Sequence, residues 1–178
     1  MTFDPRRPGL IKINVPAVRA SPNVVVGQCG SAAAILELSM PKTVSQKMGL
    51  KDGMRAFFSN APASALAAMK LPELDARQTL RGEFDCLHLF TTTQAELNKA
   101  FPKLIPHLKQ AGMLWVSWPK AGQLDTDLSL PHVIRIGYSH GLVESIALAV
   151  DATWSGLKFT RPKPGKTYRN SHGQLSAS

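Results

Sequence analysis

The chain has 178 residues, of which 44% are hydrophobic, and carries a formal net charge of +9. This length suffices for one domain with a sizeable core, and the absence of any apolar run of about 18 residues argues against a membrane-spanning helix. The histidines and the two cysteines lack metal-ligand spacing, so we expect no metal site. Because Cys29 and Cys86 lie far apart and form no redox motif, we expect a reducing, cytoplasmic location.

The positive charge is concentrated at the two ends of the sequence. Residues 1–30 have a net charge of +3 and residues 161–178 a net charge of +4, whereas residues 31–160 are nearly neutral at +2. Basic ends can neutralise nucleic-acid phosphates, or they can simply keep a protein soluble. Proline punctuation predicts that residues 1–40 form a basic extended arm with one short helix, and we expect residues 161–178 to form a basic flexible tail.

Between the ends, residues 41–160 alternate between strand and helix patterns and are expected to form one α/β domain. The alanine-rich stretch "NAPASALAAMK" predicts a helix after the first strand, and Thr93 with Glu96 forms a capping box for the next helix. Pro131 and Gly141 bracket a third helix. Apolar stretches predict strands at 54–59, 72–77, 82–90, 112–118, 142–150 and 153–160.

The order of these elements predicts the fold. Strands that alternate with helices favour a parallel sheet covered on both faces. The last two strands are separated by only a few residues, so they are expected to pair antiparallel. We therefore predict a reduced Rossmann-like, methyltransferase-like sheet that is mostly parallel and closes with an antiparallel hairpin.

Several polar and aromatic residues follow predicted strands, where open α/β sheets bind their ligands. Asn60 follows the first strand, and Trp118 and Lys120 stand at the end of "LWVSWPK". Lys120 can hold an anion or pair with Asp127 in the following loop. The structural alternative is that the tryptophan belongs to the core, the lysine is solvated and Asp127 or Ser129 caps the next helix.

The turn after the first strand argues against S-adenosylmethionine as a cofactor. It reads "SNAPASAL", with no glycine between Met54 and Arg81, and glycine is what lets a backbone approach a cofactor closely. Glu73 or Asp75, near the end of the second strand, remains able to contact ribose hydroxyls. We expect no bound cofactor, with a divergent S-adenosylmethionine-dependent methyltransferase as the alternative.

Other catalytic patterns are absent from the sequence. It contains no nucleophile elbow and no P-loop. His88 lies inside an apolar strand, so we interpret it as a core histidine, and Cys86 as a small buried hydrophobe. These observations favour a protein that is not an enzyme.

Five stretches in order resemble a bacterial family known only as a domain of unknown function: "GLKDGMRAFFSNAP", "FDCLHLF", "LWVSWPK", "TDL" and "DATWSGLKF". The resemblance covers about residues 41–160. It implies a small bacterial cytoplasmic protein, and it supplies no catalytic residues.

The closing hairpin suggests where a binding site would lie. Trp154 begins an antiparallel strand, so it is expected at the carboxyl edge of the parallel strands, beside Trp118 and Lys120. Asp151 and Lys158 flank it. We hypothesise a pocket walled by both tryptophans in a non-catalytic domain that binds a small ligand or a protein partner. The alternatives are the divergent methyltransferase and a protein that binds nucleic acid through its basic termini.

Overall fold

The computed structural model describes residues 41–120 and 122–176. The chain divides into two units, residues 1–40 and residues 41–178, and only the second is described below. The arm and short helix expected within residues 1–40 lie outside the described residues.

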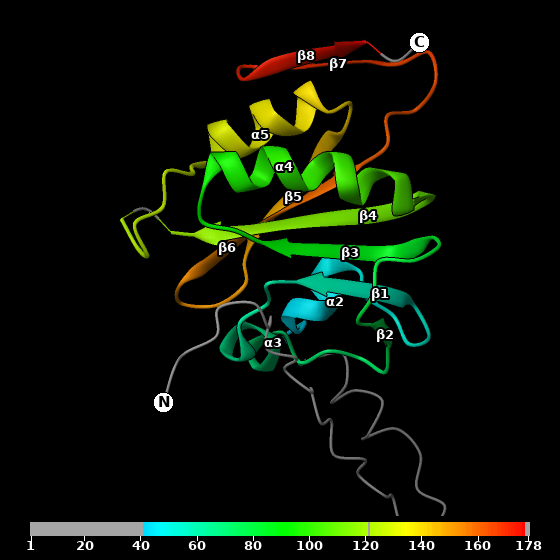
Figure 1. Cartoon of the computed structure of the whole chain (residues 1–178), viewed down its shortest axis with the longest axis vertical. Helices are drawn as coiled ribbons and strands as arrows, with labels where there is room; N and C mark the ends of the chain where they lie inside the picture. The colour runs from blue at the N-terminus through cyan, green and yellow to red at the C-terminus, as the bar shows by residue number, and fades with distance from the viewer. Residues whose placement is uncertain (1–40, 121, 177–178) are drawn as a thin grey trace, which may run out of the picture. The chain divides into compact units, whose positions relative to one another are not determined.

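A six-stranded sheet with the order β2-β1-β3-β4-β6-β5 forms the centre of the unit (Figure 1). Its first four strands in the chain pair in parallel, and β6 runs antiparallel to both β4 and β5. The predicted α/β fold, with a mostly parallel sheet and a closing antiparallel hairpin, is confirmed. The strands are β1 (Arg55–Ser59), β2 (Asp75–Arg77), β3 (Phe84–Phe90), β4 (Leu108–Pro119), β5 (Val143–Ala149) and β6 (Trp154–Thr160).

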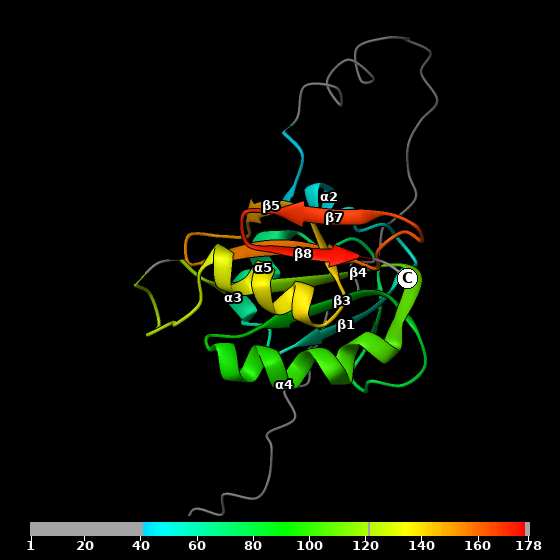
Figure 2. The same ribbon diagram turned by 90° about the horizontal axis from the view of Figure 1, so that it is seen from above.

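Helices cover both faces of the sheet (Figures 1 and 2). One face, here called the α3 face, packs against α2 (Val44–Met48) and α3 (Ala63–Met69). The opposite α4 face packs against α4 (Gln94–Leu104) and α5 (Leu130–Ser139). Each face has its own buried apolar cluster, as expected for a sheet between two helical layers.

The central strand β3 shows why the sheet is buried on both sides. Its side chains alternate, so that Leu87 and Leu89 enter the core of the α4 face while Cys86 and Phe90 enter that of the α3 face. A strand with two covered faces must be apolar at successive positions, and "CLHLF" satisfies this requirement.

The start and end of α4 follow from identifiable residues. The Thr93 hydroxyl accepts a hydrogen bond from the Glu96 amide at 3.2 Å, which caps the helix. The predicted capping box is only half formed, because the Glu96 carboxylate accepts a bond from the Thr91 hydroxyl instead. Pro102 is accommodated within α4, and the helix ends at Leu104, where the short 3₁₀ helix η1 (Ile105–His107) takes over.

The C-terminal segment differs from the flexible tail that its charge suggested. It forms a two-stranded hairpin of β7 (Thr167–Asn170) and β8 (Gly173–Ser176) that contacts α5. Tyr168 and Leu175 pack against the α4-face core, and the Asn170 side-chain amide donates to the Tyr138 hydroxyl at 3.3 Å. These apolar and polar anchors lie among the basic residues and offset the entropy lost on ordering the segment.

No helix within the described part of the chain is long and apolar enough to cross a membrane.

Candidate functional site

The strand order creates a topological switch point between β1 and β3. The chain leaves β1 towards β2 on one side and leaves β3 towards β4 on the other, so α3 and α4 lie on opposite faces. Ligands of open α/β sheets bind in the crevice beyond the strand ends at such a point. A cleft of about 260 Å³ lies there, here called the switch-point cleft, lined by Ser59, Asn60, Leu89, Thr91, Glu96, Lys99, Ala100 and Lys103.

The switch-point cleft combines a hydrogen-bonded polar floor with exposed cationic walls. Thr91 is buried, and its hydroxyl donates to Glu96 Oε2 at 2.8 Å. The Thr91 amide donates to the Ser117 carbonyl at 3.0 Å, which extends the β3–β4 pairing beyond the strand end. Lys99 and Lys103 project from successive turns of α4 and are exposed. With two ammonium groups against one carboxylate, the cleft favours a ligand that carries negative charge.

Asn60 gives the turn after β1 the conformation for which glycine is usually needed. Its φ is 55°, in the left-handed region that asparagine tolerates better than most residues with a side chain. The missing glycine therefore does not prevent a tight turn at the cleft. Asn60 is the one candidate from the sequence that lines the switch-point cleft.

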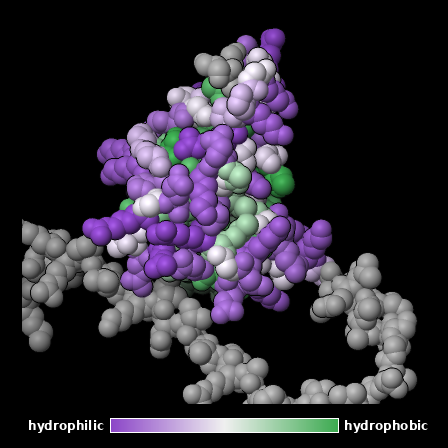
Figure 3. All heavy atoms as spheres, turned by 90° about the vertical axis from the view of Figure 1, so that its right-hand side faces the viewer, coloured by the Kyte–Doolittle hydropathy of each residue, from purple (hydrophilic) through white to green (hydrophobic). Residues whose placement is uncertain are grey.

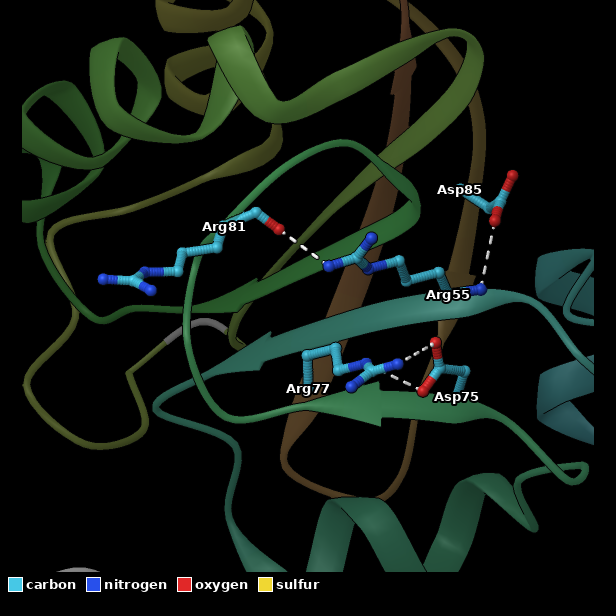
Figure 4. A network of polar contacts seen from close by, with 5 residues as sticks. All are labelled: Arg55, Asp75, Arg77, Arg81 and Asp85. Carbon is cyan, nitrogen blue, oxygen red and sulfur yellow. Dashed lines mark hydrogen bonds and ion pairs between the residues drawn. The ribbon is translucent and has the colours of Figure 1, made fainter.

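The acidic residues expected near the end of β2 lie at the wrong edge of the sheet. Asp75 is the first residue of β2, pairs in register with Arg55 and forms an ion pair with Arg77 at 2.8 Å (Figure 4). Glu73 accepts a hydrogen bond through its carbonyl from Gly53, in the turn before β1. Both carboxylates thus stand at the amino ends of the parallel strands, and neither reaches the switch-point cleft. Neither therefore occupies the position at the carboxyl end of the second strand that a ribose-binding acid takes.

Lys120 and Asp151 do come together, and they form a backbone clip. The Lys120 amide donates to the Thr153 carbonyl at 2.8 Å, and its Nζ donates to the Asp151 carbonyl at 2.7 Å. The Asp151 carboxylate in turn accepts from the Thr153 and Trp154 amides, both at 2.7 Å. These bonds fasten the β5–β6 turn to the end of β4. The motif that ends in Lys120 therefore has a structural role, and the lysine forms no ion pair with Asp127.

The two tryptophans do not wall one pocket. Trp118 lies opposite Ser155 and Trp154 lies opposite Pro119, so the indoles are one register step apart and project from opposite faces. Trp118 enters the α4-face core and lines a separate cavity of about 280 Å³. Trp154 enters the α3-face core, where it meets Phe90 edge-to-face with ring centroids 5.2 Å apart. The expected shared pocket is wrong because alternation along paired strands forbids it.

The remaining candidates have other positions. Asp127 accepts a hydrogen bond from the Gln94 amide at 2.8 Å, so it caps α4. The sequence analysis had placed this cap at the next helix, α5. Lys158 lies opposite Trp115 within β6, away from the carboxyl edge. Their role as ligand contacts stays a prediction.

A buried pair on the α3 face escaped the sequence analysis. His88 Nε2 lies 2.8 Å from the Ser117 hydroxyl, and the imidazole stacks on Phe90 with centroids 4.3 Å apart. Burial lowers the pKa of His88 to about 3 and raises the pKa of the Cys86 thiol to about 12. The interpretation of His88 and Cys86 as core residues is confirmed. The sequence does contain a signal for this pair, namely Ser117 inside the apolar run "LWVSW". A buried hydroxyl needs a hydrogen-bond partner, so a polar residue on a neighbouring strand is expected.

Within residues 41–120 and 122–176, no three His, Cys, Asp or Glu side chains are grouped so that they could hold a metal ion.

Comparisons with known proteins add the following. No protein-family model and no curated protein matches the chain, so the resemblance to a domain-of-unknown-function family stays a prediction. Among solved structures, a ribosomal protein L11 methylase from Lactobacillus delbrueckii subsp. bulgaricus is 13% identical with a TM-score of 0.46, covering 66% of this chain and 74% of that one. A 1,6-didemethyltoxoflavin-N1-methyltransferase from Burkholderia thailandensis is 9% identical with a TM-score of 0.47, covering 67% and 75%. A magnesium protoporphyrin IX methyltransferase from Synechocystis PCC 6803 with bound SAM is 10% identical with a TM-score of 0.47, covering 73% and 77%.

Proposed function

We propose that this protein is a non-catalytic domain that binds a small anionic molecule in the switch-point cleft. The observation that carries the proposal is the coincidence of a cleft with the topological switch point, where α/β sheets bind ligands. Its volume of about 260 Å³ is close to the lower end of small-molecule pockets. Lys99 and Lys103 supply the charge that selects an anion.

The chemistry around the cleft supports binding over catalysis. The His88–Ser117 pair has the atoms of a nucleophile and a base, but both side chains are buried and neither lines the cleft. A general base must come within hydrogen-bond reach of its substrate. The cleft's one carboxylate, on Glu96, is engaged by the Thr91 hydroxyl.

The second candidate is a divergent S-adenosylmethionine-dependent methyltransferase that uses the same cleft. The positive φ of Asn60 favours it, because the turn after β1 is tight without glycine. The absence of a carboxylate at the end of β2, where Arg77 is followed by Gln78, speaks against it. The two candidates therefore predict different responses to S-adenosylhomocysteine.

The test is a titration of the full-length, ¹⁵N-labelled chain followed by amide chemical shifts, with inorganic phosphate and S-adenosylhomocysteine as separate probes. Phosphate is expected to shift the amides of Asn60 and Thr91, and this response should vanish in a Lys99→Gln/Lys103→Gln variant. A Lys47→Gln/Lys51→Gln variant removes the same charge from exposed positions around α2 and should respond normally.

Three outcomes are informative. Phosphate shifts that are equal in the two variants would reject the switch-point cleft as the anion site. Saturable shifts with S-adenosylhomocysteine at these amides would replace the proposal by the methyltransferase. Shifts with phosphate alone would support a binding protein for small anions.

A further inference from the structure

The C-terminal hairpin and the segment that leads into it, residues 161–176 and together called the basic hairpin region, gather positive charge. Residues 161–176 contain four cationic side chains and no carboxylate. Lys163, Lys166 and Arg169 are exposed, and none of them forms an ion pair within residues 41–120 and 122–176. Figure 3 looks onto the side along which the segment between β6 and β7 runs in Figure 1, and hydrophilic residues cover most of that side.

The backbone that carries these charges is anchored to the rest of the unit. The Arg161 guanidinium donates to the Ile105 carbonyl at 2.9 Å and to the Leu108 carbonyl at 3.0 Å. At the far end of β7, Asn170 bonds to Tyr138 and Glu144 on α5 and β5. Arg161 thus acts as a structural residue at the root of the hairpin. A surface that is already ordered loses less entropy on binding than a flexible basic tail does.

The two faces of β7 differ in character. Tyr168 and Asn170 are half-buried towards the core, whereas Arg169 is exposed and pairs across the hairpin with the exposed Gln174. The Tyr168 hydroxyl accepts a hydrogen bond from the Lys163 amide, and the Lys166 ammonium lies 5.0 Å from the Tyr168 ring centroid. The Tyr168 ring is therefore occupied and not free to stack on a base, which leaves only the half-buried imidazole of His172 in the hairpin turn.

We propose that this basic hairpin region, residues 161–176, binds duplex DNA through its phosphates, without sequence preference. Cations that contact phosphates release counterions and provide affinity that does not depend on sequence. Single-strand binding relies on several stacking aromatics, whereas residues 161–176 offer only a covered tyrosine and one histidine. A two-stranded β-ribbon, by contrast, fits the width of a duplex groove. This surface is separate from the switch-point cleft, so the inference does not depend on the proposed function.

The experiment measures binding of the full-length chain to a fluorescein-labelled duplex of about 20 base pairs as a function of salt, from about 50 mM upwards. A Lys163→Gln/Lys166→Gln/Arg169→Gln variant removes the three exposed charges and leaves the Arg161 anchor intact. A Lys42→Gln/Lys47→Gln/Lys51→Gln variant is the control, since it makes the same change in net charge at other exposed positions. Circular dichroism of each variant checks that the fold is retained.

Three phosphate contacts contribute about 2.7 to the magnitude of the slope of log Kobs against log salt. The hairpin variant should lose most of this slope and bind about tenfold or more weakly at about 50 mM salt, whereas the control should change little. Equal weakening in both variants would show a general charge effect and overturn the proposal. Tighter binding to the matching single strand, or no binding to the duplex at the lowest salt, would overturn it as well.

Discussion

Acidification should destabilise this protein through His88. Burial lowers the pKa of His88 from 6.5 to about 3 in the folded chain, whereas the unfolded chain has the ordinary value. The folded state therefore holds the neutral imidazole, and the unfolded state gains a proton as the pH falls below about 6.5. The stability that the neutral histidine provides is complete above about pH 7 and is lost progressively down to about pH 3.

The size of the effect follows from the shift. One pKa unit corresponds to about 1.4 kcal/mol, so the free energy of unfolding should fall by roughly 2 kcal/mol between pH 7 and pH 5. About 5 kcal/mol would be lost once the pH is below both pKa values. These losses are a large part of the free energy of unfolding of an ordinary domain, about 5–15 kcal/mol.

The assay is urea unfolding of the full chain, followed by tryptophan fluorescence, at a series of pH values from about 5 to 8. A His88→Asn variant keeps a polar partner for Ser117 and removes the titrating group, so its curve should be flatter over this interval, although its stability is lower throughout. His140, whose pKa is also lowered by burial, titrates in both proteins and cancels in the difference. Parallel curves for the two proteins would refute the assignment of the pH dependence to His88.

Two further substitutions test the packing and the capping of the α4 face. Gly137→Ala would place its Cβ 2.1 Å from the Phe159 ring, so α5 and β6 would have to separate. We expect the free energy of unfolding to fall by roughly 1–3 kcal/mol, measured by thermal unfolding. An unchanged melting temperature would contradict this packing. Asp127→Ala removes the acceptor of the Gln94 amide and should cost about 1 kcal/mol and speed hydrogen exchange at the start of α4, while Asp127→Asn keeps an acceptor and should cost less. Equal exchange in both Asp127 variants would mean that the cap is not what stabilises this helix end.

The strand pattern was readable from the sequence because local rules decide it. The run "CLHLF" requires cover on both faces, and Thr93 followed by Glu96 marks the start of α4 even though only half of the capping box forms. The hairpin of β5 and β6 follows from the short connection between two apolar runs. In each case the signal and the structure that it specifies lie within a few residues of each other.

The candidate site was harder to read because it depends on register. Whether Trp118 and Trp154 share a face is decided by a single step in the pairing of β4 with β6, which no local pattern encodes. In the same way, β2 begins only at Asp75 and not at the predicted residue 72, so the carboxylate expected near its carboxyl end belongs to its first residue. The C-terminal hairpin was missed since its charge outweighed its few anchors, such as Tyr168 and Asn170.

The two halves of the carboxyl edge of the sheet differ in how their polar side chains are engaged. After the end of β4 and before the start of β6, Lys120 and Asp151 are committed to backbone groups that close the turn. If these groups bound a ligand, they would have to release the hydrogen bonds that hold the turn to the sheet. The backbone groups left without partners would then cost free energy comparable to their desolvation. At the ends of β1 and β3, by contrast, Lys99 and Lys103 have no carboxylate partner among the described residues and line a cleft. For this reason we propose the switch-point half as the place for ligand binding, although the sequence motifs drew attention to the other half.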